Sequence, residues 1–141
     1  QMFGAGSCYA CHRIGGEGGA VGPDLTSVGG KFGGYDLLES IVDPAKEISD
    51  QYGSSVFTTT DGTQLNGRIM NMRNNEYWIN TDMMNPSTVT KVKAELITSI
   101  EPSPISMMPP GLINTMNKED ILDLLAYLIS GGDRKHEFFD R

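Results

Sequence analysis

The sequence predicts a mainly α-helical domain of three to four helices, with a small antiparallel β-sheet lobe of four to five strands inserted into it. Apolar residues recur at helical spacing towards both ends of the chain. Short β-branched and aromatic segments fill the middle, and a glycine-rich stretch lies near the N-terminus. The 141 residues suffice for one domain, residues 1–141, in which the lobe occupies residues 54–100.

The N-terminal elements are expected to be two helices separated by a loop. QMFGAGSCYACHRI, residues 1–14, should form a short helix that runs into a cysteine pair. GGEGGAVGPDL, residues 15–25, is a loop whose glycines allow a close approach of the backbone. In YDLLESIVDP, residues 35–44, four apolar side chains share one helical stripe, and this helix should end before Pro44.

Short strands with turn signals between them are expected across residues 54–100. Asp61-Gly62 is a strong hairpin signal, and Asn74-Asn75 marks a second turn. We expect four or five antiparallel strands in a small sheet or barrel-like lobe. The segments concerned are SSVFTTT, TQLNGRIMNM, EYWINTD, TVTKV and ELITSIE.

A final helix is expected in NKEDILDLLAYLISGG, residues 117–132. Asn117 should cap its N-terminus with Asp120 three residues later, and Gly131 should end it. Its apolar face contains Ile121, Leu124, Leu125 and Leu128.

The charge balance argues against some classes of partner. The chain has 18 acidic and 11 basic residues, which disfavours nucleic acid and anionic membrane surfaces. No apolar run approaches the roughly 20 residues that cross a bilayer, so no membrane insertion is expected. The chain opens on Gln1 without a leader, which suggests a mature or excised form. An acidic stretch at residues 36–50 is expected to be a solvated face, with docking of a basic partner as the alternative.

The only two cysteines, Cys8 and Cys11, are followed directly by His12. A redox dithiol, half of a zinc site and a covalent c-type haem attachment all use such a cysteine spacing. A structural zinc ion needs four donors, whereas His136 is the only other histidine. A thioredoxin-like dithiol expects a preceding strand, which is not evident. CYACH contains the two thiols and the histidine that haem attachment requires, and an inert buried cysteine pair is the remaining alternative.

A six-coordinate haem also needs a second axial ligand, and SPISMMPPGL, residues 103–112, offers a thioether. The flanking prolines stiffen this segment and favour a fixed position for a sulfur atom. Met108, next to Pro109, is preferred to Met107. His136, in a charged tail, is a weaker substitute.

CYACH, VGPDL, SMMPPGL and DLLAYL follow one another in the order of the motifs of a class I cytochrome c domain, which the chain resembles. With a hairpin lobe before the methionine segment, it is most similar to the planctomycete-type haem-binding domain found at the C-terminus of large secreted dehydrogenase-like proteins. This resemblance implies a cytochrome c fold whose helices surround one covalently bound haem c (iron) per chain.

The same resemblance implies roles for individual residues. Cys8 and Cys11 would be the thioether anchors, and His12 and Met108 the iron ligands. The Pro23 carbonyl would accept the His12 Nδ1 proton and orient the imidazole. Residues expected near the haem, for which core packing is an equal explanation, are Leu25, Tyr52 and Tyr127.

The resemblance implies single-electron transfer between redox partner proteins, without substrate chemistry, in a periplasmic or exported location. One alternative is a haem sensor or peroxidase-like enzyme with a labile Met108. Another is the haem domain of a larger secreted dehydrogenase, which takes electrons from a fused or neighbouring domain. The lobe is expected to shield the haem, with partner docking through Tyr77 and Trp78 as the alternative.

Overall fold

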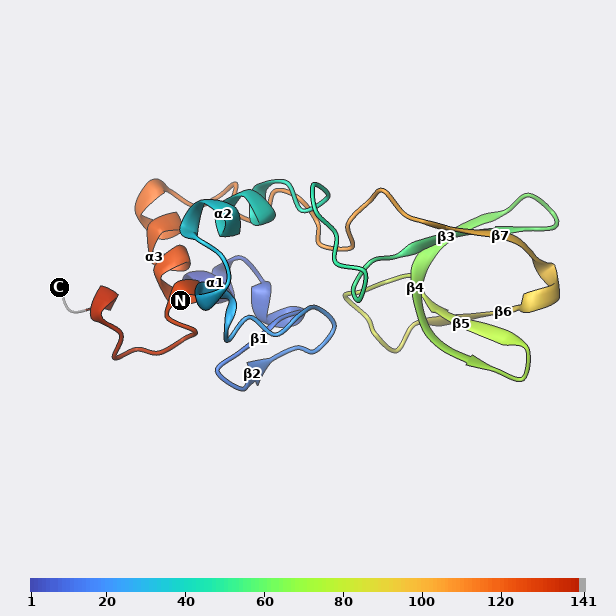
Figure 1. Cartoon of the computed structure of the whole chain (residues 1–141), viewed down its shortest axis with the longest axis horizontal. Helices are drawn as coiled ribbons and strands as arrows, with labels where there is room; N and C mark the ends of the chain where they lie inside the picture. Colours follow the sequence, from blue (N-terminus) through green and yellow to red (C-terminus); the bar gives the residue numbers. More distant parts are fainter. Residues whose placement is uncertain (140–141) are drawn as a thin grey trace. The chain divides into compact units, whose positions relative to one another are not determined.

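A computed structural model describes residues 1–139 of the chain, which divides into two compact units (Figure 1). One unit combines Gln1–Glu47 with Pro109–Arg141, and the other spans Ile48–Met108. The described residues form three α-helices and seven strands in two sheets. The prediction of a mainly α-helical cytochrome fold is therefore wrong.

The first helix is much shorter than the sequence pattern predicts. Helix α1 covers only Met2–Ala5, and a 3-10 turn, η1, follows at Cys8–Ala10. Ser7, between them, has a φ of 59° in the left-handed region, which a continuous α-helix does not permit. This break is one reason why the helical content is lower than predicted.

A two-stranded ribbon that the sequence did not predict follows the cysteine motif. Strand β1 (Arg13–Ile14) pairs antiparallel with β2 (Glu17–Gly18). Gly15 and Gly16 form the turn between them, with φ values of 58° and 84°. Two consecutive residues at positive φ are typical of a tight hairpin turn, and glycine adopts them without a steric cost.

The remaining helices of this unit lie where the sequence predicts them. Helix α2 covers Gly34–Val42, and α3 covers Lys118–Ile129. Asn117 caps α3 as predicted, because its side chain accepts a hydrogen bond from the Asp120 backbone N–H at 2.9 Å. A short 3-10 turn, η2, lies at Val28–Gly30, and another, η4, at Glu137–Phe139. The buried core of the unit consists of Phe3, Ile14, Leu37, Ile113, Leu124 and Leu128.

The second unit is built from one five-stranded antiparallel sheet with the order β6-β5-β4-β3-β7. The edge strands β6 and β7 are consecutive in the chain and are joined by the 3-10 turn η3 (Ala94–Leu96). All five strands coincide with segments that the sequence predicts as strands. They are β3 (Ser55–Thr59), β4 (Gln64–Arg73), β5 (Glu76–Asn80), β6 (Val89–Lys93) and β7 (Ile97–Pro102).

This sheet curls around a core of its own (Figure 1). Phe57 on β3 and Ile79 on β5 are fully buried. The rings of Phe57 and Tyr77 lie 6.1 Å apart, although β4 separates their strands. Gly67 on β4 permits the close packing, because a Cβ atom there would lie 2.6 Å from the Ile79 side chain. The unit thus has the barrel-like character that the strand pattern suggests.

Candidate functional site

The cysteine motif forms a tight turn that leaves both thiols unbridged. The backbone N–H groups of Cys11 and His12 both donate to the Cys8 carbonyl, at 3.2 and 2.9 Å. Cys8 and Cys11 are free cysteines, and each is partly exposed. The Cys8 side chain packs at the margin of the helical core. The two partly exposed thiols therefore lie within a single turn of the chain and are not joined by a disulfide.

The imidazole of His12 is oriented by a backbone carbonyl. His12 Nδ1 lies 2.8 Å from the Pro23 carbonyl oxygen, which is the contact that the family resemblance predicts. Because a carbonyl only accepts hydrogen bonds, Nδ1 must be the protonated nitrogen. The neutral ring then has its lone pair on Nε2, where it can bind a metal ion.

The glycine-rich loop is wrapped closely around the motif. The N–H groups of Gly19 and Gly22 donate to the carbonyls of Tyr9 and Cys11, both at 2.8 Å. A Cβ atom at Gly22 would lie 2.8 Å from Cε1 and 2.9 Å from Nδ1 of His12. Gly22 therefore leaves just enough room for the imidazole. The glycine content of the loop pointed to a close approach, but the sequence did not identify Gly22 as a site residue.

Side-chain hydrogen bonds close the loop beyond Pro23. Asp24 accepts from the backbone N–H of Thr26 at 2.9 Å and from its hydroxyl at 2.6 Å. The Thr26 hydroxyl oxygen in turn accepts from the Gly15 N–H at 2.9 Å. These hydrogen bonds to Thr26 lower the pKa of Asp24, so its carboxylate stays ionised. The loop that holds the Pro23 carbonyl is thereby tied to the β1–β2 turn.

Tyr127 connects the last helix to the cysteine motif. Its hydroxyl lies 2.7 Å from the hydroxyl of Tyr9, the residue after Cys8. The Phe3 ring packs edge-on against Tyr9 at 4.4 Å and tilted against Tyr127 at 5.6 Å. Burial, followed by the hydrogen bond to Tyr9, raises the pKa of Tyr127 to about 12. The contacts described for Tyr127 thus join α1, the motif and α3.

The other predicted site residues divide between the two units. Leu25 packs against the helical core of the first unit. Tyr52 and Met108 belong to the second unit, as does Met107. The Arg68 guanidinium lies 5.0 Å from the centre of the Tyr52 ring. The His136 ring packs against Phe138 with 4.6 Å between the centroids.

The thiols of the cysteine motif differ from those of dithiol oxidoreductases in the direction of their pKa shifts. Burial raises the pKa of both the Cys8 and the Cys11 thiol, whereas dithiol oxidoreductases use cysteines of lowered pKa. Within residues 1–139, no three or more His, Cys, Asp or Glu side chains are grouped closely enough to hold a metal ion.

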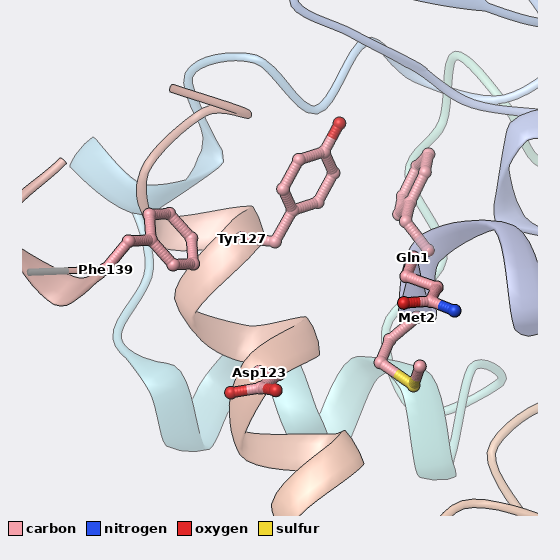
Figure 2. Close-up of a pocket in the computed structure, with 6 residues that line it drawn as sticks. Gln1, Met2, Asp123, Tyr127 and Phe139 are labelled. Carbon is pink, nitrogen blue, oxygen red and sulfur yellow. The ribbon is translucent and has the colours of Figure 1, made fainter. Parts of the chain in front are cut away.

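A small cavity of about 210 Å³ lies between α1 and α3 (Figure 2). Figure 2 shows Tyr127, Asp123 and Phe139 on one side of the cavity and Gln1 and Met2 on the other. The cysteines and His12 do not line it. The cavity is therefore distinct from the cysteine motif.

The family model for cytochrome c matches residues 1–80, more than half of the chain. The chain belongs to the cytochrome c family. Membership implies covalently bound haem c, electron transfer and redox partners, and the free thiols and available His12 Nε2 fit such a group. The match to cytochrome c ends before Met107 and Met108. No curated protein matches the sequence.

The cytochrome c domain contains no candidate membrane span in its described part. Within residues 1–139, none of the helices has both the length and the hydrophobicity needed to cross a bilayer.

Proposed function

We propose that this cytochrome c domain holds one haem c and passes single electrons between redox partner proteins, without substrate chemistry of its own. Cys8 and Cys11 form the thioether links, His12 Nε2 is the proximal ligand and Met108 is the distal ligand. The hydrogen bond between His12 Nδ1 and the Pro23 carbonyl carries this proposal, because in the neutral imidazole it places the lone pair on Nε2, and His12 directly follows a pair of free cysteines. When bound, the haem supplies a one-electron Fe(III)/Fe(II) couple.

The protein's own residues contribute orientation and basicity. The Pro23 carbonyl fixes the imidazole plane and makes Nε2 a better donor to a metal ion. Gly22 lies against the ring and leaves the space that this orientation needs. A thioether at the distal position favours Fe(II), so we expect a higher potential than a bis-histidine site would have.

Two features support Met108 as the distal ligand. Pro109 and Pro110 directly follow it and restrict the backbone. Its own N–H donates to the Ser106 hydroxyl oxygen at 3.2 Å, which orders the turn before it. Met107 shares the same segment but lies one residue further from the prolines.

We further infer an exported location, because covalent haem attachment takes place outside the cytoplasm. The electron donor is either a separate protein or a dehydrogenase domain fused to this one. The coding sequence upstream of Gln1 distinguishes these two arrangements.

The pyridine haemochrome spectrum and the near-red sulfur-to-iron charge-transfer band test the proposal. We expect one c-type haem per chain and a charge-transfer band in the oxidised protein. Met108→Ala should abolish this band, whereas Met107→Ala, the matched control, should retain it. A spectrum without c-type haem would refute the main assignment. Carbon monoxide binding to the reduced wild type would instead favour a sensor or peroxidase-like enzyme with a labile ligand.

A further inference from the structure

Buried serines of the second unit anchor the segment that leads to Met108. Ser54 precedes β3 and Ser103 follows β7, and both are almost fully buried, with 5% and 7% exposure. The Ser103 N–H donates to the Ser54 carbonyl at 2.9 Å, which extends the pairing of β3 and β7 (Figure 1). The methionine segment therefore begins at the end of a paired strand.

The Ser103 hydroxyl oxygen accepts two hydrogen bonds. One comes from the Asn66 side-chain amide on β4 at 3.1 Å, and the other from the Ile105 backbone N–H at 3.2 Å. The Ile105 carbonyl accepts from the Ser54 hydroxyl at 3.4 Å. Both backbone polar groups of Ile105 are thus satisfied by buried serines, although its side chain is 63% exposed. The hydrogen bonds therefore hold the backbone of Ile105, while its side chain contributes little burial.

We propose that Ser103, held by Asn66, is a positioning residue that fixes the backbone leading to Met108 and thereby strengthens the axial thioether ligand. This inference rests on the proposed ligation by Met108. A thioether is a weak ligand, so its occupancy depends on how much freedom its segment loses on binding. Ser103 and Pro104 restrict the start of the segment, and Pro109 restricts its end.

This role also gives the strand-rich unit a function. Asn66 lies in the middle of the sheet, opposite Val56 on β3, so its side chain is placed by strand pairing. The Ser103 hydroxyl links Asn66 on the sheet to the backbone of the methionine segment at Ile105. The β unit would then act as the support of the distal ligand, in addition to any shielding or docking role.

Displacement of the sulfur ligand by imidazole in the oxidised, haem-loaded protein tests the inference. The charge-transfer band reports the fraction of protein in which sulfur is bound. Each lost hydrogen bond is worth about a fivefold change in an equilibrium constant. Ser103→Ala should therefore raise the apparent imidazole affinity by about 5- to 30-fold, and Asn66→Ala by about fivefold. Ser87→Ala, the same substitution at an exposed position of this unit, should leave it unchanged.

A double mutant and amide exchange separate positioning from general destabilisation. Because Asn66 acts through the Ser103 hydroxyl, adding Asn66→Ala to Ser103→Ala should have no further effect on imidazole affinity. Hydrogen exchange at the Ile105 amide should become faster in Ser103→Ala but not in Ser87→Ala. Asn66 is exposed, so Asn66→Ala keeps the inference testable if Ser103→Ala does not fold.

The failure of this inference is distinguishable from the failure of the proposed function. If Met108→Ala retains the charge-transfer band, Met108 is not the ligand and both proposals about it fall. If Met108→Ala abolishes the band while Ser103→Ala and Asn66→Ala bind imidazole like the wild type, only the positioning role is overturned.

Discussion

At the residue scale, the His12 imidazole can occupy its position because residue 22 is glycine and has no side chain. Gly22 lies against the ring, and the adjacent Pro23 carbonyl accepts its Nδ1 proton at 2.8 Å. A loop that must contact both an imidazole and the Cys11 carbonyl has no space for a Cβ atom at this point. Glycine is required here for close approach and not for a special backbone angle.

Gly22→Ala should therefore disturb the candidate haem site. Its Cβ would lie within 3 Å of two imidazole atoms, so either the ring or the loop must move. Loss of the hydrogen bond to Pro23 alone should lower the free energy of unfolding of the holoprotein by about 1 kcal/mol. Denaturant unfolding and the haem-to-protein ratio are the measurements.

Gly30→Ala is the matched control for Gly22→Ala, because a Cβ atom at Gly30 would have no neighbour within 4 Å. Equal stability and equal haem content in the two variants would contradict the role assigned to Gly22.

At the element scale, the β3–β4 hairpin depends on an ionised turn residue. The Asp61 carboxylate accepts from the Thr59 hydroxyl and from the Thr63 N–H, the latter at 3.0 Å. These hydrogen bonds, that of Thr59 first, lower the pKa of Asp61 to about 2. The fold therefore favours the charged form of Asp61 over the protonated form.

Asp61→Asn should change how stability depends on pH in the acid range. Since the folded-state pKa is lowered, the stabilisation by ionised Asp61 is complete above about pH 4 and is lost as the pH falls towards about 2. The difference in unfolding free energy between wild type and Asp61→Asn should shrink over that window. Urea unfolding, followed by the β-sheet circular dichroism signal at several pH values, measures it. A difference that stays constant down to pH 2 would argue against this role.

At the scale of the whole molecule, the net charge of −7 sets the long-range electrostatics of electron exchange. The acidic residues exceed the basic ones by 18 to 11. A negative molecule attracts a cationic redox reagent and repels an anionic one, and salt screens both effects. The sign of the salt dependence is therefore predictable for each reagent.

Oxidation of the reduced holoprotein by a cationic cobalt-amine complex should slow down as ionic strength rises from about 10 mM to about 0.5 M. Oxidation by anionic ferricyanide should accelerate over the same range. Stopped-flow kinetics measure both rates. If both dependences are reversed, so that the cationic reagent reacts faster and the anionic one more slowly as salt is added, positive local charges near the haem outweigh the net charge.

Local patterns predicted several elements of the structure correctly. The cap at Asn117, the strands β3 to β7 and the Asp61-Gly62 turn all involve residues close together in the chain. Such elements depend on backbone conformation and on neighbouring side chains, which a sequence pattern expresses directly. The first helix is shorter than predicted because Ser7 adopts a left-handed backbone conformation, which a continuous helix does not permit. No strong signal in the sequence marks this position.

The balance between helix and strand could not be judged from the helical segments alone. The sequence predicts five of the seven strands of the described residues. Strands β1 and β2 were not predicted, because each has only two residues and shows no alternating pattern. In addition, α1 has only four residues, and much of the first unit consists of loops and 3-10 turns. A cytochrome c motif is thus compatible with a chain that is not mainly helical.

By itself, the sequence determined the chemistry available to this protein: two cysteines and a histidine in CYACH, a proline-flanked methionine pair, and a negative net charge. Only the tertiary structure decided which groups position that chemistry. The contacts of His12 with Gly22 and Pro23, of Tyr9 with Tyr127, and of Asn66 with Ser103 join residues from about ten to more than a hundred positions apart. Such contacts arise from chain folding and carry no local periodicity. Among them, only the contact of His12 with Pro23 was predicted, and that prediction came from the family resemblance.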